Sequence, residues 1–132
     1  ISELEQQFLD DLQRKIDAVR SDAVIADSIT PLGLPAHYWR TFDKINPVTD
    51  ARALALPMLF LQGGRDFQVI DTDWQLWRSA FADAPRATFK HYPALNHLGI
   101  AGEGPGSLDE YQKPGKVDAQ LIADVSAWIK EH

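Results

Sequence analysis

An apolar run that ends at a pair of glycines constrains the fold of this chain more than any other feature. The run Met58–Leu61 is continuous, and Gly63-Gly64 follows it closely. Runs of this kind are typical of strands buried on both faces of a parallel sheet. Pro57 is tolerated at the first position of such a strand, and the glycines are expected to end it. The sequence therefore predicts a strand over residues 57–62 within an α/β fold.

A second strand and an intervening helix follow. The segment Ala87–Tyr92 alternates between two sets of side chains, as a partly buried edge strand does. Between the two strands, three aromatic residues recur at helical spacing and predict a helix that packs them into the core. They are Trp74, Trp77 and Phe81. We expect Asp71 or Thr72 to cap this helix, and the helix to connect two parallel strands by a right-handed crossover.

The N-terminal part of the chain is predicted to contain only helices and loops. Ser2 and Glu5 have the spacing of a capping box. Apolar residues at helical spacing follow them and predict an amphipathic helix. The expected elements are a helix over residues 3 to about 20, an irregular segment over residues 21–34, and short helices over residues 35–46 and 48–55.

A long loop and a final helix are predicted after the second strand. Residues 99–115 contain five glycines and two prolines, a composition typical of loops. The acidic side chains Glu103, Asp109 and Glu110 lack the spacing of an EF-hand and are expected to be solvated. Apolar residues at helical spacing predict an amphipathic helix over residues 117–129.

The predicted strand over residues 57–62 lacks a partner on one side. Its composition is that of a central strand, but the chain supplies one neighbour for it. The other edge would expose unpaired backbone N–H and C=O groups beside large apolar side chains. We therefore expect either that another polypeptide pairs there or that the chain is part of a larger sheet. Because the first residue is Ile1 rather than Met, we expect a processed, truncated or internally started chain.

The net charge and the lengths of the apolar runs argue against several classes of binding partner. The net charge is -6 at pH 7, and the absence of a polybasic patch argues against nucleic acid and anionic membranes as partners. No apolar run approaches the length of a membrane span. The chain has no cysteine and so forms no disulfide, and the sequence leaves its cellular compartment open.

Two titratable residues follow the two predicted strands. Asp66 lies in the turn after the first strand, and His97 follows the second. A carboxylate at the end of a strand and a histidine on a nearby loop form the acid and base part of a Ser-His-Asp system. A simpler interpretation is that Asp66 binds local N–H groups of its turn and that His97 binds backbone. No serine of the chain has the G-x-S-x-G spacing of a nucleophile elbow.

Several segments together resemble the C-terminal part of bacterial α/β-hydrolases of the dienelactone-hydrolase-like and serine-aminopeptidase-like type. The matching segments are Leu56–Val69 for the seventh strand and its acid-bearing loop, Tyr92–His97 for the segment before the catalytic histidine, and Leu34–Trp39 with Asn46-Pro47 for the end of the helical cap. The resemblance implies a partial α/β-hydrolase fold: two parallel strands with flanking helices and an N-terminal helical cap segment. It places the cap at residues 1–55 and the C-terminal βαβα part of the core at residues 56–132.

The resemblance also implies roles for individual residues. Asp66 would be the triad acid and His97 the general base, whereas the first six strands, the oxyanion loop and the nucleophile would lie outside this chain. Tyr38 and Trp39 would lie on the cap, where they either contact the substrate or pack the cap. The complete enzyme would hydrolyse a small ester or peptide, and no metal or organic cofactor is implied.

Three interpretations of function stay open on the sequence. In the first, the chain is a C-terminal fragment of a serine hydrolase that is inactive alone, because the nucleophile and the oxyanion donors are absent. In the second, it is a non-catalytic structural or interaction module that homodimerises through the exposed edge of its first strand. In the third, it is half of a split enzyme that a second chain completes with the serine.

Overall fold

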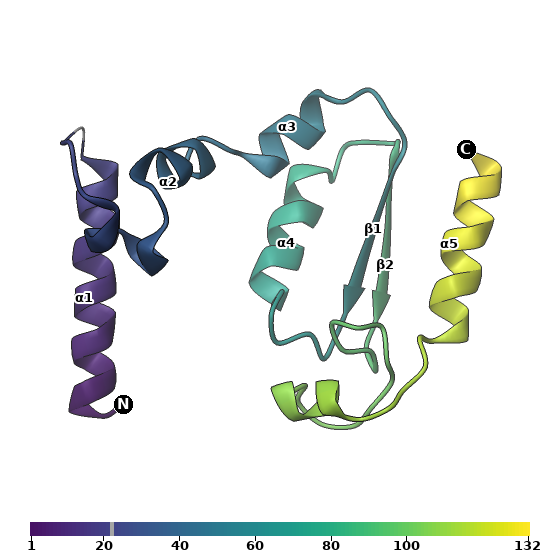
Figure 1. Cartoon of the computed structure of the whole chain (residues 1–132). Coiled ribbons are helices and arrows are strands. Elements are labelled where there is room, and N and C mark those ends of the chain that lie inside the picture. Colours follow the sequence, from purple (N-terminus) through teal and green to yellow (C-terminus); the bar gives the residue numbers. More distant parts are fainter. Residues whose placement is uncertain (22) are drawn as a thin grey trace. The chain divides into compact units, whose positions relative to one another are not determined.

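The computed structural model describes residues 1–21 and 23–132 and divides the chain into two compact units, Ile1–Pro47 and Val48–His132 (Figure 1). The boundary between cap and core that we expect after residue 55 stays a prediction. The short helix α3 (Pro47–Ala53) begins at the last residue of the first unit and continues into the second. Within the second unit, the guanidinium of Arg52 lies 5.9 Å from the centre of the Phe81 ring.

Two helices and two short 3-10 turns make up the first unit. They are α1 (Glu3–Arg20), the turns Asp27–Ile29 and Pro31–Gly33, and α2 (Ala36–Phe42). The predicted capping box is confirmed: Ser2 Oγ accepts a hydrogen bond of 3.3 Å from the Glu5 amide, and Glu5 Oε2 accepts one of 2.7 Å from the Ser2 amide. The segment 21–34, which we expect to be irregular, contains both 3-10 turns, and its residue 22 lies outside the described residues.

Arg40 joins α2 to the C-terminal end of α1. Its guanidinium donates hydrogen bonds to the carbonyl oxygens of Val19, Ser21 and Ala23, at 2.9, 2.7 and 2.7 Å. Carbonyl groups at the end of a helix have no hydrogen-bond donor within the helix. An arginine at this position supplies donors, and its positive charge interacts favourably with the negative end of the helix dipole. These contacts fix the position of α2 within the first unit.

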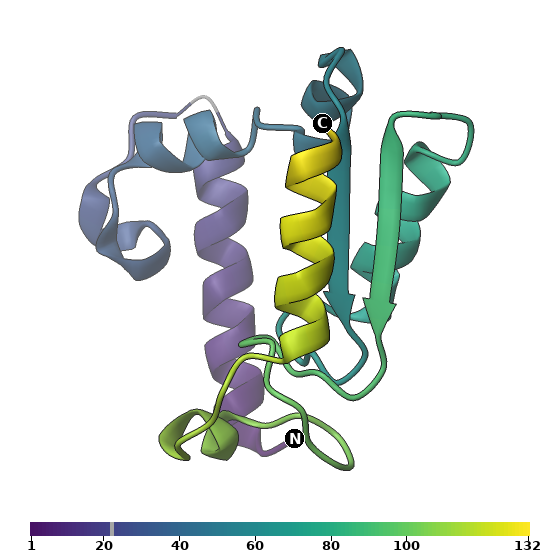
Figure 2. The same cartoon turned by 90° about the vertical axis from the view of Figure 1, so that its right-hand side faces the viewer.

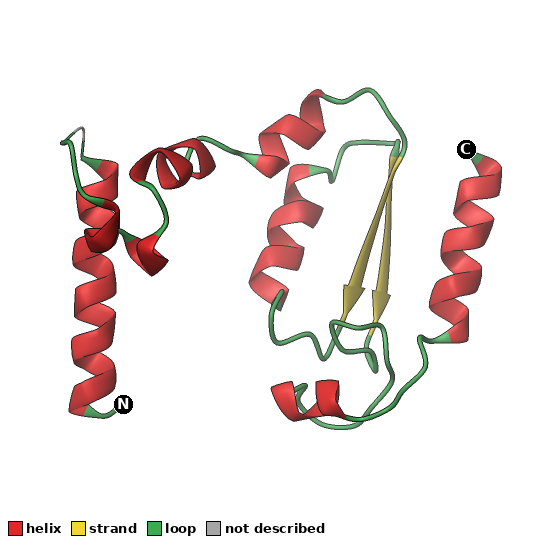
Figure 3. Ribbon diagram, in the orientation of Figure 1, coloured by secondary structure: helices red, strands yellow, loops and turns green. Residues whose placement is uncertain are grey.

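Two parallel strands form the sheet of the second unit, as predicted. β1 (Met58–Gly63) pairs with β2 (Ala87–Tyr92) in a register that runs from Met58↔Ala87 to Gly63↔Tyr92. β1 begins after Pro57 and includes Gly63, so its bounds lie one residue later than predicted. The helices α4 (Asp71–Ala80) and α5 (Ala119–Glu131) lie on opposite sides of the strand pair (Figure 3).

Aromatic side chains between α4 and the strands form the core of the second unit. Phe81 is 2% exposed and Trp74 is 6% exposed. Phe60 of β1 stacks on Phe89 of β2 with ring centres 4.7 Å apart, and its ring lies 5.2 Å from Trp77 and 5.1 Å from Phe81. The predicted burial is therefore confirmed for Trp74 and Phe81, whereas Trp77 is half-buried and packs on Phe60.

The predicted cap of α4 is wrong. Neither Asp71 nor Thr72 occupies the cap position, because the helix begins at Asp71 and Ile70 precedes it. The carboxylate of Asp73 instead accepts a hydrogen bond of 3.1 Å from the Ile70 amide. A carboxylate in the first turn interacts favourably with the positive end of the helix dipole and accepts a hydrogen bond from a free amide. The helix therefore begins without a polar cap residue.

Asp124 anchors α5 to β2 on the face opposite α4 (Figure 2). Its carboxylate accepts hydrogen bonds from Tyr92 Oη at 2.8 Å and from Lys90 Nζ at 3.0 Å. Burial, together with the neighbouring carboxylate, raises the pKa of Tyr92 to about 12. α5 begins after its cap residue Asp118, so Val117, which we predict to be helical, precedes the helix.

The expected burial of β1 on both faces is not observed. Residues 58–60 are half-buried and Leu61 is 38% exposed. Within the described residues, β2 is the only strand that pairs with β1. The amides of Met58 and Gly64 donate toward the β2 side, at 2.9 and 2.8 Å. Because successive residues of a strand alternate, the backbone groups of Leu59 and Leu61 point to the opposite edge.

The segment predicted as a long loop contains regular structure. A short 3-10 helix, η3 (Leu108–Gln112), forms within it. An isolated bridge between Leu95 and Ala101 closes the loop that follows β2. This loop carries His97, so the ordering of the glycine-rich segment bears directly on the predicted site.

Candidate active site

The turn after β1 carries Asp66 and lies against the loop after β2. The Arg65 amide donates a hydrogen bond of 2.9 Å to the Leu95 carbonyl oxygen. A Cβ atom at Gly63 would lie 2.5 Å from that same oxygen, so the close approach of the two loops requires glycine. The two loops therefore meet at the carboxyl ends of the strands, where parallel sheets place functional side chains.

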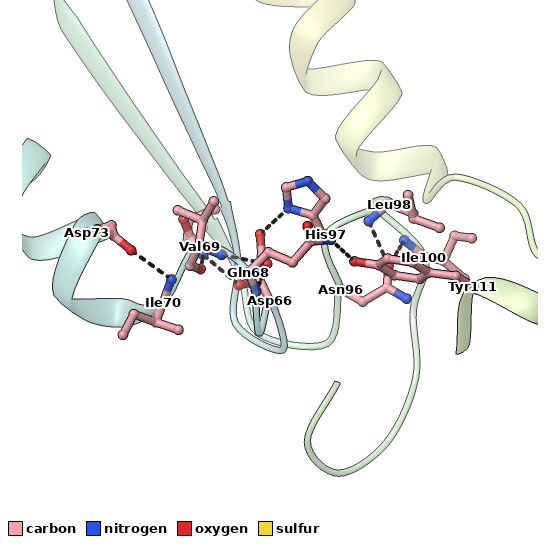
Figure 4. Close-up of polar contacts among 12 residues, drawn as sticks. Asp66, Gln68, Val69, Ile70, Asp73, Asn96, His97, Leu98, Ile100 and Tyr111 are labelled. Carbon is pink, nitrogen blue, oxygen red and sulfur yellow. Dashed lines mark hydrogen bonds and ion pairs between the residues drawn. The ribbon is translucent and has the colours of Figure 1, made fainter. Parts of the chain in front are cut away.

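Asp66 and His97 meet between these loops. His97 Nδ1 lies 2.8 Å from Asp66 Oδ2 (Figure 4). The other carboxylate oxygen accepts hydrogen bonds from the amides of Gln68 and Val69, at 2.9 and 3.0 Å. The side chain of Asp66 is 8% exposed, and that of His97 is 39% exposed. The structure brings together the two residues selected from the sequence, and Asp66 also binds the amides of its own turn.

The surroundings keep Asp66 ionised. Burial raises the pKa of Asp66, but hydrogen bonds from the Val69 amide, the His97 imidazole and the Gln68 amide outweigh it, and the pKa lies below the usual value. A carboxylate in this position accepts a hydrogen bond from Nδ1–H and leaves Nε2 of the ring to take a proton. It also stabilises the imidazolium ion that then forms. The pair therefore has the chemistry of a general base oriented by an acid.

A cavity of about 360 Å³ adjoins the pair. Its lining includes Asp66, His97, Leu61, Leu98, Val117 and Leu121. A mostly apolar cavity with a few polar groups at one point is typical of a site for a small ligand. The imidazole thus lies at the boundary between a buried carboxylate and an accessible apolar space.

Tyr38 and Trp39, the predicted substrate contacts, lie on α2 in the first unit. Their rings meet edge to face with centres 5.3 Å apart. Trp39 Nε1 donates a hydrogen bond of 3.0 Å to the Pro31 carbonyl oxygen, and Tyr38 is 46% exposed. Trp39 therefore has a packing role within its unit, and contact of either residue with a substrate stays a prediction.

The prediction that Glu110 is a solvated loop residue is wrong. Its side chain is 22% exposed and forms an ion pair with Arg65. It also accepts a hydrogen bond of 2.8 Å from Asn96 Nδ2. Arg65 and Asn96 directly precede Asp66 and His97 in the sequence. An arginine beside the predicted acid, and a carboxylate in the nearby loop, are the signals that would have pointed to this group.

Within residues 1–21 and 23–132, no group of three His, Cys, Asp or Glu side chains could hold a metal ion. Across the same residues, no helix combines the length and the apolar character needed to cross a membrane.

Comparison with known proteins bears on the class of the chain. It is similar to Esterase EstD of Thermotoga maritima, with 36% identity over 98 residues. These residues are 74% of this chain and 24% of the esterase, so the chain spans about a quarter of the length of the relative. No protein-family model and no solved structure matches the chain. The similarity relates this part of the chain to an esterase, and within the described residues two parallel strands and five α-helices form a partial α/β fold.

Proposed function

We propose that Asp66 and His97 are the acid and the general base of a serine hydrolase that cleaves carboxylic esters. The observation that carries the proposal is the distance of 2.8 Å between His97 Nδ1 and the buried carboxylate of Asp66. The similarity to an esterase supports esters over peptides as the substrate class. In this proposal the chain is the C-terminal part of an α/β-hydrolase of the dienelactone-hydrolase-like or serine-aminopeptidase-like type.

The pair would transfer protons while another part of the enzyme supplies the nucleophile. A serine hydroxyl attacks the acyl carbon as His97 Nε2 takes its proton, and His97 then protonates the departing alkoxide. Water repeats the sequence on the acyl-enzyme and releases the carboxylic acid and the free serine. Asp66 holds the imidazole throughout. Tyr38 and Trp39 would contribute apolar surface for the substrate, and the chain without a nucleophile elbow would be inactive alone.

A chimeric esterase tests the proposal. The segment of Esterase EstD that matches this chain is replaced by the corresponding 98 residues, and hydrolysis of p-nitrophenyl acetate and butyrate is measured. We expect the chimera to hydrolyse both esters and the isolated chain of 132 residues to hydrolyse neither. Ester hydrolysis by the isolated chain that survives both Asp66→Asn and His97→Gln would contradict the roles assigned to this pair.

A second candidate function is a structural module that homodimerises through β1. The backbone groups of Leu59 and Leu61 point away from β2, and the Leu61 side chain is 38% exposed. Two copies that pair edge to edge across a two-fold axis would satisfy these groups and cover the side chain. Light scattering coupled to size exclusion is expected to give twice the chain mass of 14.8 kDa if this function holds. A compact monomer would count strongly against it.

A further inference from the structure

A bridge of charged and polar side chains joins the acid loop to the histidine loop, in addition to the Asp66–His97 contact. One carboxylate oxygen of Glu110, on η3, forms an ion pair with Arg65. The other accepts a hydrogen bond of 2.8 Å from Asn96 Nδ2. The Arg65 side chain is 7% exposed and Asn96 is 4% exposed. Little water reaches Arg65 and Asn96, whereas the Glu110 side chain is 22% exposed, so the charge-assisted contacts are only partly screened.

The bridge acts on the residues next to the catalytic pair. Arg65 immediately precedes Asp66, and Asn96 immediately precedes His97. The Asn96 side-chain oxygen also accepts hydrogen bonds of 3.0 and 3.1 Å from two amides of the histidine loop. A single carboxylate of Glu110 therefore restrains the backbone on which both members of the pair are held.

The same 3-10 helix makes further contacts with the acid loop. Tyr111 Oη is hydrogen-bonded to Gln68 Nε2, and its ring lies 5.7 Å from the Phe67 ring (Figure 4 labels Gln68 and Tyr111). Arg65 also donates hydrogen bonds of 2.6 and 3.0 Å to two carbonyl oxygens of the glycine-rich segment. A Cβ atom at Gly106 would overlap the Arg65 carbonyl oxygen, so this segment is packed directly onto the acid loop.

Polar contacts, together with the Tyr111–Phe67 ring contact, hold η3 in place. Leu108, the first residue of η3, is 67% exposed and contributes little burial. The hydrogen bonds from Arg65 and Asn96 hold the pKa of Glu110 below its usual value. Glu110 is therefore ionised at neutral pH, where both of its contacts are strongest.

We propose that Glu110 is a positioning residue for the Asp66–His97 pair, and that η3 is a bracket that keeps the acid and histidine loops at the spacing of their hydrogen bond. The inference rests on the proposed function only in assigning a catalytic role to the Asp66–His97 pair. The bracket itself concerns the geometry of the pair, so it is tested on the isolated chain without any enzyme assay.

Long-range ¹H–¹⁵N correlation spectra of the His97 ring, recorded where the ring is neutral, provide the test. These spectra report the ratio of the Nδ1–H to the Nε2–H tautomer, and His97→Gln assigns the signals. We expect the Nδ1–H tautomer to dominate in the unsubstituted chain, because Asp66 accepts its proton. Glu110→Ala removes both the Arg65 ion pair and the Asn96 hydrogen bond. We expect it to lower the tautomer ratio about tenfold, on the order of the net effect of one charge-assisted hydrogen bond.

Exchanging the two partners of the bridge separates positioning from general stability. The single variants Glu110→Gln and Asn96→Asp keep side-chain volume but lose the donor–acceptor match, so each is expected to lower the ratio. In the double variant the amide of residue 110 donates to the carboxylate of residue 96, so donor and acceptor are reversed. The net charge is kept, and the amide oxygen of residue 110 still accepts the hydrogen bond from Arg65. We expect it to restore most of the Nδ1–H population, which a merely destabilised chain would not do.

A carboxylate outside the bracket serves as the control. Asp124→Ala removes the acceptor of the Tyr92 and Lys90 contacts on α5 and is expected to lower the Tm without changing the His97 tautomer ratio. An unchanged ratio in folded Glu110→Ala, or no restoration by the double variant, overturns the bracket and leaves the proposed function standing. A dominant Nε2–H tautomer in the unsubstituted chain would instead contradict the hydrogen bond on which the proposed function rests.

Discussion

Replacement of His97 by glutamine in the chimeric esterase is expected to lower kcat for ester hydrolysis by about 10⁴-fold. Glutamine keeps a polar side chain but does not exchange a proton near neutral pH. The serine therefore loses its base, and the departing alkoxide loses its acid. KM is expected to change little, because His97 acts on the transferred proton rather than on substrate binding. Steady-state kinetics with p-nitrophenyl butyrate measures both constants.

His91 provides a matched control for this substitution. It is an exposed histidine on β2, and its ring lies 5.9 Å from the Trp74 ring. We expect His91→Gln to leave kcat within about twofold of the unsubstituted chimera, as is usual for exposed positions outside a site. If His97→Gln retained full kcat, His97 would be excluded as the general base. Equal large losses in both variants would point to the fold of the chimera rather than to proton transfer.

The secondary structure of the second unit is predictable because local patterns specify it. The apolar run at β1, the alternation at β2 and the helical spacing of the α4 aromatics each identify one element. The Asp66–His97 pair is predictable for a related reason. Both residues lie in loops that follow strands connected by a helix, and the carboxyl ends of parallel neighbours lie at one edge of a sheet.

The bracket at Glu110 is not predictable because it depends on contacts between distant segments. Glu110 pairs with Arg65 across 45 positions of the sequence. In a glycine-rich segment, the local pattern does not specify which carboxylate turns inward, and Glu103 and Asp109 are equally acidic neighbours. Only the folded positions of the acid and histidine loops select Glu110.

The burial of β1 and the cap of α4 fail as predictions for different physical reasons. The apolar composition of β1 indicates a covered strand, but cover depends on neighbours, and within the described residues β2 is the only strand paired with it. At α4 the failure is local. Asp73 satisfies the free amide of Ile70 from inside the first turn, and this competes with capping by Asp71 or Thr72.

The largest loss of stability is expected from Phe81→Ala. Phe81 is 2% exposed, and its ring lies 5.1 Å from Phe60 and 6.1 Å from Trp77. Removal of a buried phenyl ring leaves a cavity and costs about 3–5 kcal/mol. A small protein has a total stability of about 5–15 kcal/mol, so this is a large share. Urea unfolding followed by tryptophan fluorescence is expected to show a midpoint lowered by about 2 M.

Leu76→Ala on α4, the helix that Phe81 directly follows, tests whether this cost comes from burial. Leu76 is 57% exposed, so its truncation is expected to change the free energy of unfolding by less than about 0.5 kcal/mol. A similar small change in Phe81→Ala would show that packing of α4 on the strands does not hold the second unit together. The expected large loss would extend to the site, because Phe60 lies on β1, the strand that leads into the Asp66 turn. The aromatic core would then determine the position of the acid, and η3 would determine its alignment with the histidine.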